Sequence, residues 1–354
     1  MTPHKLERLL LACPGDRLGG TERHTALLAA GLAARGFSVR FAAPTAILAA
    51  LAPPGCTLLP LEPGLLADPP DALLIALPWP DAAPEWLAPL AGSGLPRLIL
   101  LHLVPHDPPP MAGPWVAGSL FAAVSAPLAR RAEAAFGLPP MGCALLANPP
   151  PDAAPHDRAT TRTAIRAALG LPADAPLLLF LGRLEAAKGA DWLPAISARL
   201  PATLAVAGEG PMAGLICAGA ASDPRGLLRP LGHLPDPAPW IAAADALILP
   251  SRLEGAPLAF LEAAAAMCPV VATAAALEAL GPDAAALAWI GEGVAGLAEA
   301  ARACLADPGG AAARARLARA ALASRPWSGG DWAATLDRIE ALLRAAFLPA
   351  MEEA

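Results

Sequence analysis

The 354-residue chain has no long uninterrupted apolar run, although 56% of its residues are hydrophobic and its mean hydropathy is +0.49. A helix that spans a bilayer needs about 20 predominantly apolar residues in a row. The longest uncharged stretches, 41–61 and 108–129, are interrupted by prolines, and the surplus of apolar residues is mostly Ala and Leu spread along the chain. We therefore expect a protein without a transmembrane segment.

The sequence also lacks metal-type cysteine spacing, a basic surplus and a signal-peptide pattern. Six cysteines occur without a C-x-x-C pair, which fits reduced, packed thiols. The formal net charge of −6 argues against a nucleic-acid partner. The charged start 1–8 runs directly into an apolar strand, so we expect a cytoplasmic protein. Contact with the inner face of a membrane stays open, although no strongly basic amphipathic helix argues for it.

Short apolar runs alternate with helix-like segments along the whole chain. This alternation predicts parallel sheets covered on both faces. The predicted strands are 9–12, 38–43, 73–77, 98–104, 177–181, 203–207, 246–249 and 270–272. The predicted helices are 21–35, 163–169, 191–200, 239–243, 258–267 and 331–347, with one further helical stretch, 294–323, that Pro308-Gly309-Gly310 breaks.

A segment rich in Pro, Asp and Ala, 148–157, reads as a linker between two such domains. We predict an α/β fold with two Rossmann-like, doubly wound domains that face a cleft. The first comprises 1–155 and is completed by a C-terminal helix, 329–350, and the second comprises 160–326. Doubly wound domains bind ligands at the carboxyl ends of their strands, so the loops after the strands carry the functional information.

The most informative loop follows the predicted strand 246–249. It contains Glu254, turns through Gly255 and Pro257, and enters an alanine-rich helix that carries Glu262. Eight residues span about 12 Å along a helix axis. Pro257 suits the first helical position, and free N–H groups at a helix start attract phosphate. A solvated Glu262 is the alternative, but its helix is nearly all apolar, and a carboxylate there needs partners or a ligand.

Two cations follow the predicted strand 177–181. Arg183 and Lys188 lie in a loop flanked by Gly182 and Gly189, where they could clamp a diphosphate. A solvated loop is the alternative.

Weaker signals follow three other strands. Gly19-Gly20 permits a close backbone approach before a helix start, but the loop is not G-x-G-x-x-G and could be an ordinary turn. Gly208-Glu209-Gly210-Pro211 is a tight turn after the predicted strand 203–207, and Gly232-His233-Leu234 is a similar turn. His102 and His106 flank the end of 98–104, facing either the ligand side or the core.

Taken together and in order, these motifs resemble the family-four retaining glycosyltransferases of the GT-B fold. The resemblance spans most of the chain and is strongest between 177 and 273. The two acids with seven residues between them, downstream of the Arg/Lys loop, form its most specific part. It implies that a nucleotide sugar docks mainly on the second domain and a hydroxyl acceptor mainly on the first.

The resemblance also implies roles for individual residues. Arg183 and Lys188 would hold the diphosphate, Glu262 the ribose hydroxyls and Glu254 the donor sugar, with His102 near that sugar and His106 as its substitute. The catalytic set is therefore Arg183, Lys188, Glu254 and His102. The donor-binding set is Gly19, Gly20, Gly182, Gly208, His233, Leu234, Gly255, Ala256, Pro257, Leu258 and Glu262. No cofactor or metal is implied, and the chain has no D-x-D pair.

The chain departs from the family pattern near the donor sugar. Gly255-Ala256-Pro257 stands where Gly-Phe-Pro is usual, Cys268 replaces a glycine, and Ala274-Ala275-Ala276 replaces a Gly-Gly pair. These changes leave the diphosphate and ribose positions intact. Two alternatives to a UDP- or GDP-sugar-dependent transferase stay open: a catalytically silent nucleotide-sugar-binding subunit and a nucleotide-sugar epimerase of the same fold.

Overall fold

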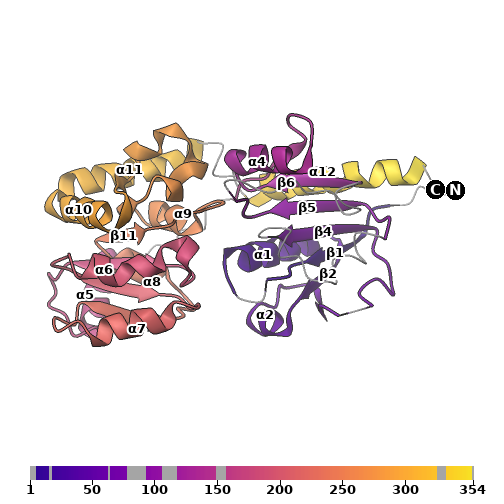
Figure 1. Ribbon diagram of the computed structural model, residues 1–354. Helices are drawn as coiled ribbons and strands as arrows, with labels where there is room; N and C mark the ends of the chain where they lie inside the picture. The colour runs from indigo at the N-terminus through magenta and orange to yellow at the C-terminus, as the bar shows by residue number, and fades with distance from the viewer. Residues whose placement is uncertain are drawn as a thin grey trace. The chain divides into compact units, whose positions relative to one another are not determined.

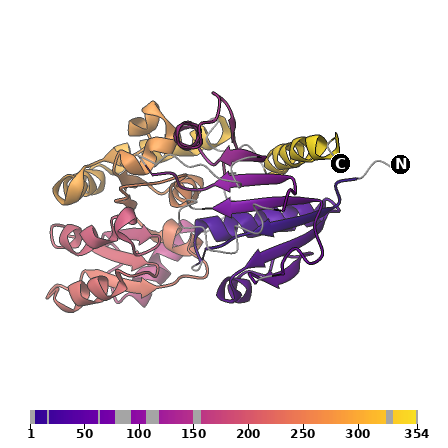
Figure 2. The same ribbon diagram turned by 45° about the vertical axis from the view of Figure 1, so that its right-hand side comes forward.

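The computed structural model of the chain describes residues 5–15, 18–62, 64–77, 93–105, 118–148, 157–324 and 332–352. The chain divides into two units, of which unit 1 is Met1–Pro149 with Asp331–Ala354 and unit 2 is Pro150–Gly330. In Figures 1 and 2, each unit is a sheet with helices packed on it. Within the described ranges, no helix combines the length and the apolarity that a bilayer crossing requires.

Unit 1 contains a seven-stranded parallel sheet in the order β3-β2-β1-β4-β5-β6-β7. Its strands are β1 (Arg8–Ala12), β2 (Ser38–Ala43), β3 (Thr57–Pro60), β4 (Ala72–Leu77), β5 (Arg97–Leu101), β6 (Ser119–Ala123) and β7 (Cys143–Leu145). Its helices are α1 (Gly20–Ala34), α2 (Thr45–Ala50), α4 (Ala126–Phe136) and α12 (Trp332–Glu352). The C-terminal helix α12 packs on β4, β5 and β6, so the end of the chain completes the unit in which it starts (Figure 2).

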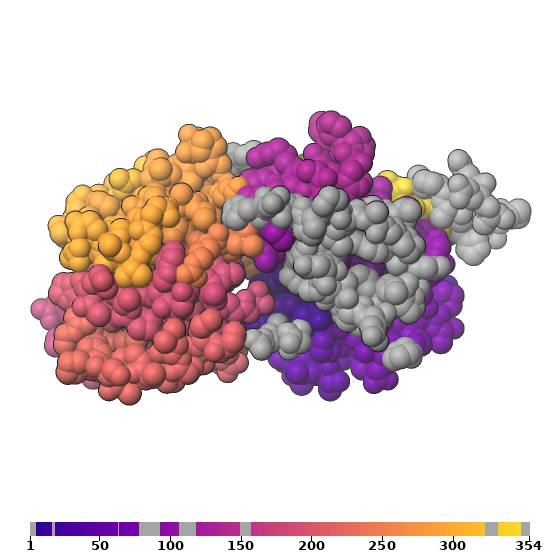
Figure 3. Space-filling view, viewed as in Figure 1, coloured from indigo at the N-terminus to yellow at the C-terminus, as the bar shows by residue number. Residues whose placement is uncertain are grey.

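Unit 2 contains a six-stranded parallel sheet in the order β10-β9-β8-β11-β12-β13. Its strands are β8 (Leu177–Leu181), β9 (Thr203–Ala207), β10 (Leu228–Gly232), β11 (Ala246–Leu249), β12 (Val270–Ala272) and β13 (Trp289–Ile290). Its α-helices are α5 (Arg158–Ala168), α6 (Leu193–Ser197), α7 (Ala213–Ala221), α8 (Ala238–Ala243), α9 (Leu258–Ala265), α10 (Gly293–Ala306) and α11 (Pro308–Ser324). In the space-filling view, α7 and α10 form much of the visible surface of this unit (Figure 3).

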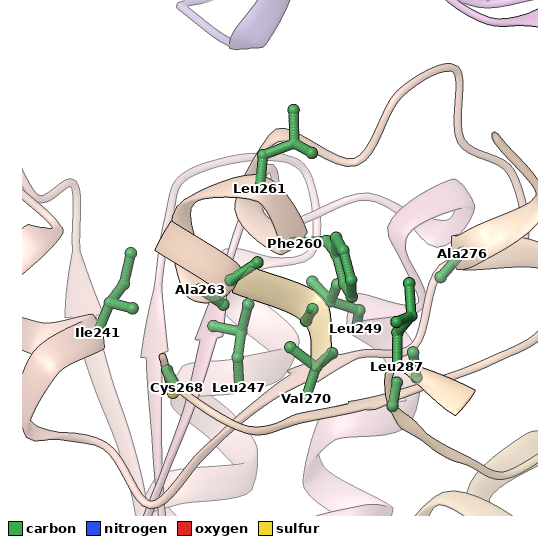
Figure 4. Packing of buried hydrophobic residues seen from close by; sticks show 14 of the residues in the cluster. Ile241, Leu247, Leu249, Phe260, Leu261, Ala263, Cys268, Val270, Ala276 and Leu287 are labelled. Carbon is green, nitrogen blue, oxygen red and sulfur yellow. The ribbon is translucent and has the colours of Figure 1, made fainter. Parts of the chain in front are cut away.

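The central strands of both sheets are buried on both faces, which explains why they read as continuous apolar runs. All residues of β4, β5, β9 and β11 are buried. In unit 2, Phe260 and Ala263 of α9 pack over Leu247, Leu249 and Val270 of the sheet (Figure 4). This packing fixes the position of α9 and of the loop that leads into it.

Several predicted boundaries are wrong. The strand predicted over 98–104 ends at Leu101, so His102 is the first residue after it. The helix predicted over 191–200 is a 3₁₀ turn, Ala190–Trp192, followed by the short α6. The break predicted in the late helical stretch is confirmed, because α10 ends at Ala306 and Pro308-Gly309-Gly310 begins α11. Asp307 precedes it and accepts a hydrogen bond from the Gly310 N–H at 2.8 Å, as a helix N-cap does.

Other elements were not predicted at all. These are β3, β6, β7, β10, β13, α2, α4 and α7. Most are short, and β7 has only three residues. The predicted linker 148–157 lies outside the described residues except at its two ends, and Asp157 caps α5 by accepting a hydrogen bond from the Ala159 N–H.

Candidate functional site

The strand order of unit 2 reverses between β8 and β11, which are neighbours in its sheet. In a doubly wound sheet, the loops after two such strands diverge and leave a ligand crevice at their carboxyl ends. The loop after β8 carries Arg183 and Lys188, and the loop after β11 carries Glu254. The topology alone therefore brings the predicted cationic loop and the first predicted acid to the same edge of one unit.

Lys188 and Glu254 form an ion pair across these two loops. The Lys188 Nζ donates to Glu254 Oε2 at 2.5 Å, and the Ser251 hydroxyl donates to Glu254 Oε1 at 2.7 Å. The Glu254 side chain is 7% exposed and that of Lys188 is 24% exposed. A carboxylate offers about four acceptor positions and an ammonium three donors, so both groups keep capacity for a ligand.

The backbone of the two loops is in direct contact. The N–H groups of Arg252 and Leu253 both donate to the Ala187 carbonyl, at 2.8 and 3.3 Å. Gly189 has a φ of +68°, and a Cβ atom there would lie 2.1 Å from the Pro250 carbonyl oxygen. A side chain at this position would push the loops apart, so Gly189 is required for their contact.

The loop after β12 supports this arrangement from the other side. The Thr273 hydroxyl donates to the Ser251 carbonyl at 2.5 Å and accepts from the Ala276 N–H at 3.1 Å. The loop that bears the Ala-Ala-Ala departure is thus tied to the loop that bears Glu254. Neither Ser251 nor Thr273 was among the predicted site residues, because isolated hydroxyls in a sequence give no signal of burial.

Arg183 lies at the start of the same β8 loop. Its guanidinium is 36% exposed and lies 3.5 Å from the Glu185 carboxylate. Gly182 before it donates to the Ala207 carbonyl, and Gly208 has a φ of +143° with no room for a Cβ atom against the Gly182 carbonyl. The two glycines therefore let the loops after β8 and β9 pack backbone to backbone, which orients Arg183.

The second acid lies on α9, as predicted, but the approach to the helix differs. Pro257 is the residue before α9 and not its first helical residue, because its ψ of 86° is not helical. Glu254 lies in the loop four residues before the helix, so the helical spacing of about 12 Å to Glu262 does not apply. Glu262 is half-buried, Gly255 is buried, and Ala256 and Leu258 are half-buried.

The remaining predicted residue pair of unit 2 follows β10. The Gly232 carbonyl accepts from the Gly208 N–H at 2.8 Å, which ties this turn to the loop after β9. His233 is exposed, and Leu234 packs against the core cluster that contains Phe260. The structure gives His233 a surface position, and its predicted donor-binding role stays a prediction.

In unit 1, the predicted Gly19-Gly20 pair lies at the start of α1, where Gly19 is the N-cap and no side chain caps the helix. The equivalent switch point in this sheet lies between β1 and β4. Glu22, in the first turn, is buried, and its Oε1 would lie 1.9 Å from a Cβ atom at Gly15. Gly15 thus lies close to a buried carboxylate.

His102 is buried next to a second histidine that was not predicted. The rings of His102 and His24 meet edge to face with centroids 5.2 Å apart, and Trp332 of α12 lies 5.7 Å from His24. Burial lowers the pKa of His24 to about 4. Burial and the nearby His24 hold the pKa of His102 well below its ordinary value, so both rings are neutral at pH 7. His106 lies outside the described residues.

Unpartnered buried polar atoms concentrate at this edge of unit 1. They are the two ring nitrogens of His24, Nε2 of His102, Oγ of Ser125 and Oδ1 of Asn148. His102, Ser125 and Asn148 follow the carboxyl ends of β5, β6 and β7, which are consecutive in the sheet. Most buried polar atoms in folded proteins have a partner, so this edge is suited to a polar ligand.

Part of the chain is similar in sequence to known proteins. Residues 175–307 match the model of the family Glycosyl transferases group 1. Two curated relatives are D-inositol 3-phosphate glycosyltransferases, one from Xylanimonas cellulosilytica, 36% identical over 133 residues, and one from Mycobacterium tuberculosis, 36% identical over 128 residues. These matches span 33% and 32% of this chain, and only 30% and 25% of the relatives. Residues 175–307, which lie in unit 2, are therefore similar in sequence to group 1 glycosyltransferases.

Solved structures extend the likeness to the whole chain. WaaG, a glycosyltransferase of lipopolysaccharide biosynthesis, matches with a TM-score of 0.73 and 17% identity over 94% of this chain and 99% of WaaG. Anabaena HepE in complex with UDP and glucose matches with a TM-score of 0.73 and 17% identity over 96% of this chain and all of HepE. At this identity the likeness defines the fold alone. The chain has the GT-B fold of two parallel-sheet α/β domains.

Proposed function

We propose that this protein is a glycosyltransferase that moves a hexose-type sugar from a nucleotide-diphosphate donor to a hydroxyl acceptor with retention at the anomeric carbon. The observation that carries the proposal is the Lys188–Glu254 pair at the β8/β11 switch point, inside the segment that matches group 1 glycosyltransferases. A cation for the diphosphate and a carboxylate for sugar hydroxyls lie side by side there.

The proposed reaction exchanges one bond for another. The acceptor oxygen forms a bond to the anomeric carbon while the bond from that carbon to the diphosphate oxygen breaks, and the acceptor proton passes to the departing phosphate. Fixed cations that meet the charge developing on the leaving group stabilise the transition state. Arg183 and Lys188 supply two such cations, and the scheme requires no metal ion.

The other roles follow from the positions already described. Glu254, held by Lys188 and Ser251, would accept hydrogen bonds from donor-sugar hydroxyls through its remaining lone pairs. Glu262 on α9 would bind the ribose. His102, neutral at pH 7, would hydrogen-bond the transferred sugar. The donor we favour is UDP- or GDP-linked, and the acceptor is a glycolipid, a growing polysaccharide or a small metabolite.

Calorimetric titration with UDP and GDP tests the donor site. We expect one of them to bind the wild-type protein, and Glu262→Ala or Arg183→Ala to abolish binding. Glu299→Ala on α10, which removes an exposed glutamate of the same unit, is the control and should bind normally. Failure of both nucleotides to bind the wild-type protein would overturn the proposal.

Product analysis separates the transferase from its alternatives. An epimerase would convert a donor sugar without any acceptor, and a silent subunit would bind nucleotide without transfer or donor hydrolysis. We expect neither pattern, because the switch point of unit 2 combines cations with a hydroxyl-binding carboxylate. Donor turnover that depends on an added hydroxyl acceptor supports the transferase.

A further inference from the structure

Arg252 connects the two loops of the candidate site more extensively than any residue singled out from the sequence. Its guanidinium donates two parallel hydrogen bonds to the Asp191 carboxylate, both at 2.7 Å, and a third to the Ala186 carbonyl. The same group lies over the Trp192 ring, 4.0 Å from its centroid. One side chain of the β11 loop thus makes four contacts with the segment that follows β8.

These contacts join the same two loops as the Lys188–Glu254 pair. Ala186 and Asp191 lie on either side of Lys188 in the sequence, and Arg252 lies two residues before Glu254. The Arg252 N–H also donates to the Ala187 carbonyl. Separation of the two loops would therefore break the Arg252 contacts as well as the ion pair.

We propose that Arg252 is a positioning residue that, together with Asp191 and Trp192, locks the β8 and β11 loops in the geometry that binds the diphosphate of the donor. This inference rests on the proposed function, because it assigns the lock to that same site. Arg252 itself does not bind the ligand. A bidentate guanidinium–carboxylate pair of this kind is strong and geometrically specific. The carboxylate neutralises the positive charge of the guanidinium, which would otherwise attract a phosphate.

The alternative hypothesis is that Arg252 binds the phosphate directly. The variant Asp191→Asn distinguishes the two hypotheses. If Asp191 holds Arg252 in a lock, Asp191→Asn must weaken nucleotide binding. If Arg252 is a phosphate ligand, Asp191→Asn releases it from a competing anion, and binding is unchanged or tighter.

A matched control is available in the same unit. Arg225 donates three side-chain hydrogen bonds, the number that Arg252 donates, but one goes to Asp223 and two go to the carbonyls of Leu200 and Ser197. Its side chain is 40% exposed, and that of Arg252 is 36% exposed. Arg225→Gln therefore removes a comparable set of bonds at a place outside the candidate site.

The experiment compares full-length wild type, Arg252→Gln, Asp191→Asn and Arg225→Gln by calorimetry with the nucleotide, UDP or GDP, that binds the wild-type protein. Hydrogen exchange of segments 186–192 and 250–254 is measured without nucleotide. Misplacement of binding groups by about 1 Å typically costs on the order of 100-fold in function. We expect Arg252→Gln and Asp191→Asn each to weaken binding roughly 10- to 100-fold and to speed exchange in both segments. Arg225→Gln should do neither.

Two outcomes overturn the inference while leaving the proposed function intact. One is Arg252→Gln binding nucleotide as tightly as Arg225→Gln. The other is weak binding by Arg252→Gln combined with normal or tighter binding by Asp191→Asn, which would make Arg252 a ligand of the phosphate. Absence of nucleotide binding by the wild-type protein overturns the proposed function and the positioning role together, whatever the exchange data show.

Discussion

Gly189 touches the carbonyl oxygen of Pro250, and this contact joins the loop that carries Lys188 to the loop that carries Glu254. A Cβ atom at Gly189 would lie 2.1 Å from that oxygen, and the φ of Gly189 is +68°. The close approach brings two loops that follow different strands within reach of one ion pair.

Gly189→Ala should therefore abolish nucleotide binding as well as reduce stability. Gly170→Ala is the matched control, because Gly170 has the same φ of +68° but no atom within 4 Å of its missing Cβ. Both variants carry the backbone strain of about 1–2 kcal/mol, and Gly189→Ala alone displaces Pro250. Thermal unfolding and calorimetric titration measure the two effects. Equal nucleotide affinity in the two variants would contradict the importance of the contact.

The Lys188–Glu254 pair gives a second prediction, about stability. Lys188→Met removes the cation from the buried Glu254 carboxylate and leaves Ser251 as its remaining described partner. Removing one member of a buried ion pair lowers the stability of the fold, because the other charge stays buried without compensation. We expect a loss of about 2–4 kcal/mol. The additional change Glu254→Gln removes the stranded charge and should restore part of that loss.

Urea unfolding of Lys188→Met, Glu254→Gln and the double variant measures the coupling between the two residues. Nucleotide binding should remain lost in all three, because the cation and the carboxylate are both part of the proposed site. A double variant no more stable than Lys188→Met would show that the pair is too solvated to matter for stability.

The sequence predicted the strands that carry this site better than the contacts between its loops. Strands 38–43, 177–181, 203–207, 246–249 and 270–272 were placed at their observed bounds, because each is a short apolar run ended by turn residues. The strand at 98–104 was predicted too long, since the apolar run continues to Val104 after the sheet pairing stops. The doubly wound pattern sufficed to place Lys188 and Glu254 in loops after strands, whereas the pairing of β8 with β11 was not predicted.

Tertiary contacts could not be predicted in the same way. Arg252 looks like a solvated loop cation in the sequence, and only the fold brings it to Asp191, 61 residues earlier. His24 stands between Arg23 and Thr25 in the polar first turns of α1, and the sequence gives no sign of its contact with His102. Pairings across such distances follow from packing and not from local propensity.

His24 predicts a pH dependence of the stability of unit 1. Burial lowers its pKa from the ordinary 6.5 to about 4, so between these pH values the unfolded chain binds a proton that the folded protein does not. Stability therefore falls as the pH falls through this window. Each pKa unit of the shift corresponds to about 1.4 kcal/mol, so the total loss of stability is about 3 kcal/mol.

Urea unfolding at pH 7 and pH 4.5 measures this effect in wild type and in His24→Phe. The variant keeps a ring, loses the two unpartnered nitrogens, and should lose less stability on acidification than wild type. The buried His102, whose pKa is also lowered, keeps part of the pH dependence. Leu28→Ala on the same helix is the control, because it lowers stability without removing a titrating group. A wild-type pH dependence in His24→Phe would contradict the assignment to His24.

Four buried thiols, two in each unit, allow the binding site to be assigned to one unit. Burial raises the pKa of Cys13 and Cys143 in unit 1, and of Cys268 and Cys304 in unit 2, to about 12. These thiols should resist alkylation at pH 8 until their unit unfolds, whereas Cys217 is exposed and should react at once.

A nucleotide at about 100 times its dissociation constant stabilises the state that binds it by about 2.7 kcal/mol. In mild urea it should therefore slow alkylation of Cys268 and Cys304 about 100-fold and leave Cys13 and Cys143 unaffected, as mass spectrometry of labelled peptides can show. Equal protection of all four thiols would contradict a nucleotide site confined to unit 2.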